Sequence, residues 1–416
     1  MSAHYDRLET RSPQSRDTAA YRALRAILGI ARHRAPALRA QLRGVELSKL
    51  ANAAALAKTP PIRKSDLIRL QKDAAPFGGL AAAKPGHLRR LLVSPGPIFE
   101  PEGAAKDWWG AARAFYAAGL RKGDIVHNSF SYHLTPGAHI MESGCAAIGA
   151  AVIPGGVGQT EQQIEAIEAL RPNFYAGTPD FLKVLLDKAK ELGRDVSSIK
   201  RALVSGAALP PSLRQELLER GVVVRQCFAT ADLGVVAYES EDDDGAVLPG
   251  MVVNEGLIVE IVRPGASEPV APGEVGEIVV TRLNSDYPLL RFATGDLTKQ
   301  LDGASPCGRT NMRIAGWMGR ADQTTKVKGM FVHPSQIAEI GKRHPELGRL
   351  RLVVTRENEQ DVMTLRAETK AADGALKAAV AESLQALTKL RGKVDLVELG
   401  QLPDDGKTVA DERPVG

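Results

Sequence analysis

The strongest constraint on the fold is an alternation of short apolar runs with segments of helical spacing between residues 91 and 228. The apolar runs are 91–94, 124–130, 150–155, 173–179, 201–206 and 222–228. Helical spacing covers 104–118, 137–148, 160–170, 179–192 and 211–220. Repeated strand–helix–strand units of this length predict a mostly parallel sheet with helices on both faces. Ligands of such sheets bind beyond the carboxyl ends of the strands.

The flanking regions have a different pattern. Residues 18–56 have the spacing of short helices, and 76–87 form a loop rich in glycine and proline. After residue 250, the apolar runs 256–262 and 276–283 are joined by turn residues with no helix between them. This arrangement predicts a small antiparallel sheet or distorted barrel. Beyond residue 320, strands and helices together predict a compact α+β unit.

We therefore expect an α/β protein of two domains, since 416 residues exceed the size at which a single core stops growing. The large domain, residues 1–320, would join a basic helical region at 1–90, an α/β core at 91–249 and a β-rich part at 250–320. Residues 321–416 would form a small, mobile α+β domain.

The net charge of +5 is unevenly distributed along the chain. Residues 1–90 hold 18 Lys or Arg against 6 Asp or Glu, or +12, which leaves −7 for the remainder. A basic region can bind nucleic acid, but arginines spread through amphipathic helices more often form a solvated face, and no nucleic-acid motif accompanies them. We expect no nucleic-acid partner.

Cysteine usage and apolar segments indicate the compartment. Cys145, Cys227 and Cys307 are far apart and odd in number, which argues against a disulfide framework or a zinc site of the CxxC type. The first residues lack the apolar core of a signal peptide, and no apolar run is long enough to cross a membrane. We expect a cytoplasmic protein without a membrane partner.

Five loops follow the predicted strands in a fixed order: VSGAAL at 204–209, CFATADLG at 227–234, RFATGDL at 291–297, GRADQTTKVKG at 319–329 and LPDDGK at 402–407. This ordered set resembles the adenylate-forming ligases, most closely their phenylacetate-CoA ligase branch. The resemblance covers nearly the whole chain. It implies a small carboxylic acid as substrate, with ATP (leaving AMP), Mg²⁺ and CoA. A homodimer is one option for the assembly, which the sequence leaves open.

The resemblance implies a nucleotide site made of Ser205, Gly206, Ala207, Phe228, Ala229, Thr230, Asp296, Trp317 and Arg320. The loop that begins at Ser205 would lie against the adenine, because small residues let the backbone approach a flat base, and Phe228 would offer a π face. On its own, the same loop also fits a simple helix start.

Two carboxylates are expected to act on the nucleotide. Asp296 follows Gly295 and, taken alone, suits a turn. By resemblance it binds both ribose hydroxyls, a task that suits a two-oxygen acceptor. Asp232 stands where the family usually has a glutamate near Mg²⁺, and a shorter carboxylate can act there through a water. Its other reading is a cap for the segment that follows.

Three further residues would act in the reaction cycle. Asp322 matches the hinge about which the small domain turns between the two half-reactions, and Arg320 would reach ribose or phosphate. Lys407 resembles the lysine that contacts the acid and the α-phosphate, where its ammonium offsets developing charge. With Asp232, Lys407 and Arg320 form the expected catalytic set, while Lys326 and Lys328 continue the pattern after the hinge.

The phosphate loop departs from the family. Relatives have a run rich in Ser, Thr and Gly that ends in Lys-Pro, whereas residues 93–103 read VSPGPIFEPEG. Pro95 and Pro97 remove two backbone donors, no lysine is present, and Glu100 and Glu102 bring negative charge toward the phosphates. This loop predicts a slower first half-reaction.

The organic acid is expected in an apolar pocket lined by Phe130, Tyr132, Pro154, Gly155 and Gly156, which suits a flat aryl or small acyl group. His127 and His133 are read as structural.

The sequence thus favours an AMP-forming acyl- or aryl-CoA ligase. Two alternatives stay open: an adenylate-forming enzyme that passes the acyl group to an amine or a carrier protein, and a non-catalytic homologue that only binds nucleotide or acyl groups.

Overall fold

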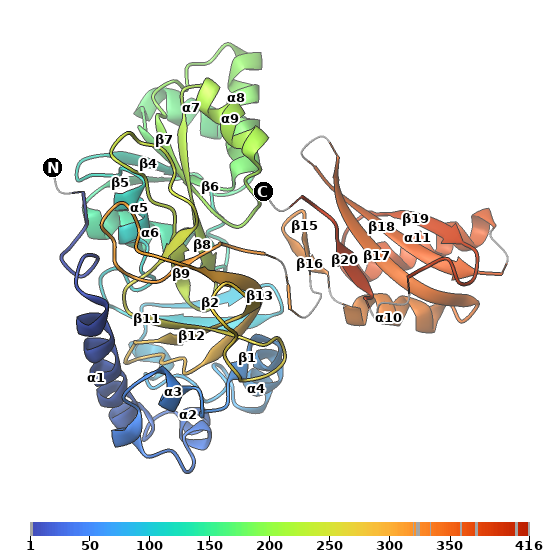
Figure 1. Ribbon diagram of the computed structural model, residues 1–416. Coiled ribbons are helices and arrows are strands. Elements are labelled where there is room, and N and C mark those ends of the chain that lie inside the picture. The colour runs from blue at the N-terminus through green and yellow to red at the C-terminus, as the bar shows by residue number, and fades with distance from the viewer. Residues whose placement is uncertain are drawn as a thin grey trace. The chain divides into compact units, whose positions relative to one another are not determined.

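The computed structural model describes residues 3–318, 320–321, 325–332, 334–357, 360–370, 373–403 and 407–414. The chain divides into a large unit, Met1–Met318, and a small unit, Gly319–Gly416 (Figure 1). Each unit has a hydrophobic core of its own, and each is described by itself.

Five parallel strands form one half of the main sheet of the large unit, in the order β5-β4-β6-β7-β8. They are β4 (Ile125–Asn128), β5 (Ala151–Pro154), β6 (Phe174–Gly177), β7 (Arg201–Val204) and β8 (Val223–Thr230). The helices among them in sequence are α6 (Gly137–Ile148), α7 (Thr160–Leu170), α8 (Pro179–Leu192) and α9 (Pro211–Glu219). The predicted α/β class is confirmed.

The helices cover both faces because neighbouring side chains of a strand point in opposite directions. On β6, Phe174 and Ala176 belong to the core that includes buried residues of α6, such as Met141. Tyr175 belongs to a second core, with Leu182 of α8 and residues of α7 and α9. Figure 1 accordingly has α7, α8 and α9 grouped together, apart from α6.

The sheet continues without a break into an antiparallel half. Its strands are β9 (Gly234–Tyr238), β10 (Met251–Val253), β11 (Leu257–Val262), β12 (Val275–Arg282), β13 (Phe292–Leu301) and β14 (Arg313–Ile314). Their order from β8 onward is β9-β10-β14-β13-β12-β11. The β-rich part of the chain is therefore joined to the α/β core by continuous hydrogen bonding through the β8–β9 hairpin.

The amino-terminal region packs on this antiparallel half. It contains α1 (Pro13–Ala31), α2 (Pro36–Gln41), α3 (Ala53–Leu56) and α4 (Leu67–Asp73), with 3-10 turns η1 (Leu47–Lys49), η2 (Lys64–Asp66) and η3 (Pro85–His87). Leu24 and Leu28 of α1 share a core with Leu290, which precedes β13. The short strand β1 (Ile62–Arg63) lies parallel to β13, with Arg63 opposite Ala293.

Residues 91–118 differ from the sequence prediction. The run 91–94, grouped with the alternating strands, forms β2 (Arg90–Ser94), a separate hairpin with β3 (Ile98–Glu102). The helix predicted over 104–118 is reduced to α5 (Ala112–Ala117). Asp107 and Gly110 have φ angles of 54° and 70°, which a helix cannot contain. The Asp107 carboxylate accepts a hydrogen bond of 2.8 Å from Ala111 N, so the helix starts late.

The basic residues of the amino-terminal region do not all form a solvated face. Arg16 is buried and pairs with Glu255 at 2.9 Å. Arg63 pairs with Glu277 at 2.8 Å, and Lys64 pairs with Asp232 at 2.6 Å. Part of the +12 charge is thus turned toward acidic groups of the large unit.

The small unit is an α+β fold. A four-stranded sheet has the order β19-β18-β17-β20, and β15 and β16 form a separate hairpin. The elements are β15 (Thr325–Val327), β16 (Met330–Val332), α10 (Pro334–Arg343), β17 (Leu347–Glu357), β18 (Gln360–Thr369), α11 (Gly374–Thr388), β19 (Lys393–Val397) and β20 (Val409–Asp411). In the described part of both units, no helix combines the length and apolar character needed to cross a bilayer.

Arg291 fixes the amino-terminal region to the sheet. Its side chain is fully buried and its guanidinium pairs with Glu260 at 2.9 Å. The same group donates to the carbonyls of Ala57 and Thr59, at 2.8 and 2.5 Å. Its own carbonyl accepts from Ile62 N at 3.0 Å, which begins the β1–β13 pairing.

Replacing Arg291 with methionine should lower the free energy of unfolding of the large unit by about 3–5 kcal/mol, because Glu260 is left buried without its partner. Urea unfolding followed by tryptophan fluorescence measures the change. Arg171→Met is the control, since its pair with Asp195 is half exposed, and it should have little effect. Equal losses in the two variants would contradict the role given to Arg291.

Candidate functional site

Two hydrogen bonds hold the loop after β7, which is expected to lie against the adenine. The parallel pairing of β7 with β8 places Val204 opposite Gln226, so Ser205 comes beside Cys227. Ser205 Oγ donates to the Cys227 carbonyl at 2.8 Å, and Ser205 N donates to the Gly177 carbonyl at 3.2 Å. Its hydroxyl is therefore used to hold the loop, and the exposed backbone of Gly206 follows with a φ of 77°.

The residues from Phe228 to Asp232 form the end of β8 and its turn into β9. Phe228 is half-buried and packs on the main core, and the strand register shifts between Phe228 and Ala229. The Thr230 hydroxyl accepts from Leu233 N at 3.2 Å, which shapes the turn. Asp232 then points inward, with 1% of its surface exposed.

Asp232 has one bonded and one unbonded oxygen. Its Oδ2 accepts from Lys64 Nζ at 2.6 Å, while Oδ1 is buried and has no hydrogen-bond partner among the residues that the structure describes. A buried carboxylate oxygen without a donor is costly, which makes it a fitting anchor for a ligand. The expectation that Asp232 caps the next segment has no hydrogen bond to support it in the same described residues.

Asp296 was expected in a loop at the end of a strand, but it lies within β13, which continues to Leu301, and it is buried. Its amide donates to the Thr294 hydroxyl at 3.1 Å, and its Oδ1 accepts from Trp317 Nε1 at 3.0 Å. Trp317, expected beside the nucleotide, thus holds the very carboxylate expected to bind the ribose. Gly295 has a φ of 76°, which lets the strand bend between Thr294 and Asp296.

Lys64 was not recognised from the sequence. It directly follows β1, so the pairing of β1 with β13 carries it to the Thr294–Asp296 stretch. Burial acts to lower the pKa of its ammonium, but the charge and hydrogen bond of Asp232, with Glu100 and Asp296 adding to them, raise that pKa above its ordinary value. The one signal that the sequence offered is a basic pair, Arg63 and Lys64, one residue after the two prolines Pro60 and Pro61.

The altered phosphate loop is a hairpin whose acidic groups are neutralised. Glu100 is buried and accepts hydrogen bonds from Ser94 Oγ at 2.5 Å and Ser94 N at 3.2 Å. Burial, together with the charge of Asp232, raises the pKa of Glu100 to about 8. Glu102 pairs with Arg90 at 2.7 Å. The loop therefore repels phosphate less than its sequence predicts.

The residues expected around the organic acid come from two adjacent parallel strands. Phe130 and Tyr132 follow β4, and Pro154 ends β5 opposite Asn128. The Tyr132 hydroxyl accepts from Asn128 Nδ2 at 2.9 Å. A Cβ added to Gly156 would lie 4.0 Å from the Tyr132 ring, so the ring and the glycine loop are neighbours.

His127 holds the glycine loop at 155–158 in place through Gln163. It is fully buried, and its Nε2 lies 2.7 Å from Gln163 Oε1. Gln163 Nε2 in turn donates to the carbonyls of Gly156 and Gly158. Burial lowers the pKa of His127, with the Gln163 hydrogen bond acting in the other direction. A Cβ on Gly155 would come within 2.7 Å of the imidazole, so only glycine fits there.

The remaining expected residues belong to the small unit. Arg320 is half-buried, and Lys407 is exposed with its carbonyl accepting from Arg351 Nη1 at 3.4 Å. Lys326 lies on β15, and the Lys328 amide donates to Asp361. Asp322, which was expected to be the hinge, lies outside the described residues.

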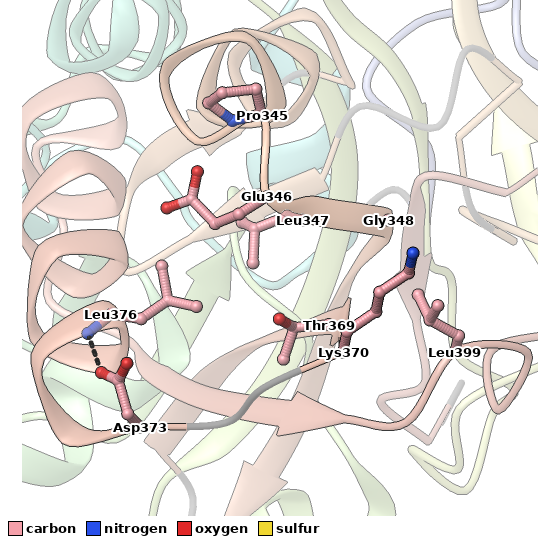
Figure 2. A pocket seen from close by; sticks show the side chains of 9 residues that line it. All are labelled: Pro345, Glu346, Leu347, Gly348, Thr369, Lys370, Asp373, Leu376 and Leu399. Atoms are coloured by element: carbon pink, nitrogen blue, oxygen red, sulfur yellow. Dashed lines mark hydrogen bonds between the residues drawn. The ribbon is translucent and has the colours of Figure 1, made fainter.

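A hollow of about 590 Å³ in the small unit contains none of the expected site residues (Figure 2). Its lining is Pro345, Glu346, Leu347, Gly348, Thr369, Lys370, Asp373, Leu376 and Leu399. The dashed line in Figure 2 marks the bond of 2.7 Å from Leu376 N to Asp373, which caps α11. The Asp373 carboxylate thus serves as the N-terminal cap of α11.

The donor set of the large unit fits a magnesium ion shared with a ligand. Mg²⁺ in phosphate sites is commonly bound through one or two carboxylates, with phosphates and waters completing the shell. The free Oδ1 of Asp232 suits such a single anchor. Across the described residues, no group of three or more His, Cys, Asp or Glu could hold a metal by itself.

Residues 111–284 match the family model of the AMP-binding enzymes, and residues 329–413 match that of the AMP-binding enzyme C-terminal domain. Phenylacetate-coenzyme A ligase from Thermus thermophilus is 30% identical over 328 residues, which are 75% of this chain and 72% of that protein. The enzyme of the same name from Aromatoleum evansii is 29% identical over 341 residues, 78% and 75% of the two chains.

The fold is similar to a crystal structure of 2-hydroxyisobutyryl-CoA ligase in complex with 2-HIB-AMP and CoA. The TM-score is 0.83 at 25% sequence identity, and the match covers 100% of this chain and 93% of the other. Both units thus have counterparts in a solved ligase.

In wild type, part of the folding stability should be lost as the pH rises from about 4.5 to about 8, and Glu100→Gln should not show this part of the loss. The unfolded chain releases the Glu100 proton near the ordinary pKa of 4.5, whereas the folded protein keeps it up to about 8. Wild type therefore loses stability relative to Glu100→Gln as the pH rises between these values, and the difference is constant above them. Melting temperatures measured from pH 4 to 9 test this.

Glu46→Gln is the matched control, because Glu46 is exposed and the hydrogen bond from Lys49 lowers its pKa. The control should change stability little, and in the opposite direction. A pH-independent difference between wild type and Glu100→Gln would contradict a protonated Glu100.

Proposed function

Because the chain belongs to the phenylacetate-coenzyme A ligase family of AMP-binding enzymes, we propose that it activates a small, flat carboxylic acid with ATP and transfers the acyl group to CoA. The chain is an AMP-forming acid–CoA ligase. The acid attacks the α-phosphorus of ATP and pyrophosphate leaves; the thiol of CoA then takes the acyl group and AMP leaves. Such displacements need positioning and charge neutralisation rather than a protein nucleophile.

One observation carries the proposal: the ammonium of Lys64 pairs with the buried Asp232 at 2.6 Å and lies in the field of two further carboxylates, Glu100 and Asp296. Here Asp232 keeps an oxygen without a hydrogen-bond partner among the described residues, and Asp296 is oriented by an indole N–H. This is the arrangement expected of groups that a charged ligand completes.

The nucleotide would lie along the carboxyl ends of β7 and β8. We assign the adenine to the loop Ser205–Ala207 and to Phe228, whose half-buried ring is available for packing. Asp296 would accept both ribose hydroxyls, with its orientation fixed by Trp317. Mg²⁺ would be held by Asp232 with phosphate oxygens, and it would supply positive charge to the phosphates.

The acid would bind between Tyr132 and the loop Pro154–Gly156. Because Gly156 has no side chain and lies next to the Tyr132 ring, a flat group would be favoured there over a branched one. The buried His127 and Gln163 keep the loop in place and would not touch the acid.

The small unit would complete the cycle. We assign Asp322 as the hinge, Arg320 as a contact to ribose or phosphate, and Lys407 as the cation for the first half-reaction. A cytoplasmic location follows from the chemistry of the proposal, because ATP and CoA are supplied there.

A second candidate has one observation in its favour. Pro95 and Pro97 deprive the phosphate loop of two donors, so the chain could bind nucleotide and acyl groups without forming the adenylate. ATP–pyrophosphate exchange across aryl and short-chain acids separates the two. Exchange, followed by thioester formation when CoA is added, supports the ligase, and nucleotide binding without exchange supports the binder. If exchange occurs but the acyl group is transferred only to amines or to a carrier protein, the acceptor is that amine or carrier and not CoA.

Asp296→Ala should weaken AMP binding about 10- to 100-fold, because hydrogen bonds to a charged group contribute about 1.5–3 kcal/mol. Lys407→Ala should leave AMP binding unchanged and lower pyrophosphate exchange about 100-fold or more, because its cation acts on the transferring group. Calorimetry and the exchange assay measure the two effects.

Each variant has a control in its own unit. Asp302→Ala changes an exposed aspartate just beyond the end of β13, and Lys393→Ala changes an exposed lysine of the small unit. Neither should alter binding or exchange. The assigned roles fail if Asp296→Ala and Lys407→Ala have the same profile.

A further inference from the structure

We propose that Lys64 is a nucleotide-binding residue whose ammonium holds the polyphosphate of ATP, in place of the lysine that the phosphate loop lacks. The inference rests on the proposed function and deepens it, because it assigns the triphosphate to a group from the amino-terminal region.

Lys64 is brought to the site by strand pairing. Ile62 lies opposite Phe292 and Arg63 opposite Ala293, so the next residue leaves the strand beside the Thr294–Asp296 stretch. Its Nζ lies 2.6 Å from Asp232 Oδ2. The ammonium thus stands in reach of the carboxylate assigned to the metal and in the field of the one assigned to the ribose. In the proposed binding mode, the phosphates of the nucleotide would run between these two positions.

The ammonium retains capacity for a ligand. It has three N–H donors, and among the described residues its one hydrogen-bond partner is Asp232. The Lys64 side chain is 21% exposed whereas Asp232 is 1% exposed, so the pair is open on the side of the lysine.

The neighbouring cation is committed elsewhere. Arg63 Nη1 donates to Glu277 at 2.8 Å and Nη2 donates to the Ala266 carbonyl at 3.1 Å. Glu277 also accepts from Gly295 N at 3.2 Å. Arg63 therefore fixes the backbone next to Asp296, and Lys64 is the residue of the pair that faces Asp232.

The phosphate loop cannot provide this charge itself. Residues 93–103 contain no lysine or arginine, and Pro95 and Pro97 lack backbone donors. Without Lys64, the phosphates would meet Asp232 and Asp296 with no cation from the amino-terminal region. An ammonium serves phosphate as a compact point charge, which suits this position.

Binding of adenosine, AMP and ATP to wild type and to Lys64→Met, measured by calorimetry at one Mg²⁺ concentration, tests the inference. ATP affinity should fall about 10- to 100-fold, AMP affinity less, and adenosine affinity not at all, because the lost contact is a charge-assisted bond to phosphate. Lys64→Arg should keep most of the ATP affinity. Lys72→Met, an exposed lysine on α4, is the control and should bind like wild type.

An equal loss of affinity for all three ligands would overturn the inference, because it would show that the Lys64–Asp232 pair only stabilises the fold. An unchanged ATP affinity would also overturn it, because it would show that Lys64 does not contact the nucleotide. A second measurement uses wild type alone, so that it holds even if Lys64→Met does not fold. ATP should protect Lys64 from an amine-reactive label, quantified by mass spectrometry, and adenosine should not. Equal labelling with both ligands overturns the inference. If wild type binds none of the three, the proposed function fails first, and this inference fails with it.

Discussion

The buried arginine at the start of β13 is the interaction on which the arrangement of the large unit depends. Arg291 binds Glu260 and the carbonyls that precede β1, and its own carbonyl starts the β1–β13 pairing. That pairing carries Lys64 to Asp232. A charge buried in the core is tolerated only when it is fully paired, so the amino-terminal region cannot move away from the sheet without a large cost. The same packing holds Lys64 in place beside Asp232.

Charge is balanced locally in the large unit, although it is separated along the sequence. The excess of positive charge lies before residue 91, yet Arg16, Arg63 and Lys64 each meet a carboxylate from the later part of the chain. The negative groups of the phosphate loop are balanced as well, Glu102 by Arg90 and Glu100 by keeping its proton. The hairpin at the expected phosphate loop is therefore less anionic than its sequence indicates.

Local patterns predicted the elements well where periodicity was strong and failed where single residues decided. The helix at 137–148 and the strands of the parallel sheet follow from regular apolar spacing. The helix at 104–118 was overpredicted, because the left-handed backbone of Asp107 and Gly110 leaves no trace in apolar periodicity. The sequence placed Phe228 at the end of a strand, as the structure has it, but it expected Asp296 in a loop, whereas β13 continues through it. The motifs also could not reveal that Trp317 donates to Asp296, a contact between residues 21 positions apart.

The sequence by itself determined the α/β class and the family of the chain, because these depend on periodicity and on ordered motifs that are local along the chain. Only the tertiary structure decided which charges face each other. Lys64 and Asp232 are 168 positions apart, and no periodicity encodes the pairing that brings them to 2.6 Å. The protonation of Glu100 likewise depends on burial and on the field of a distant carboxylate, and both are properties of the folded chain.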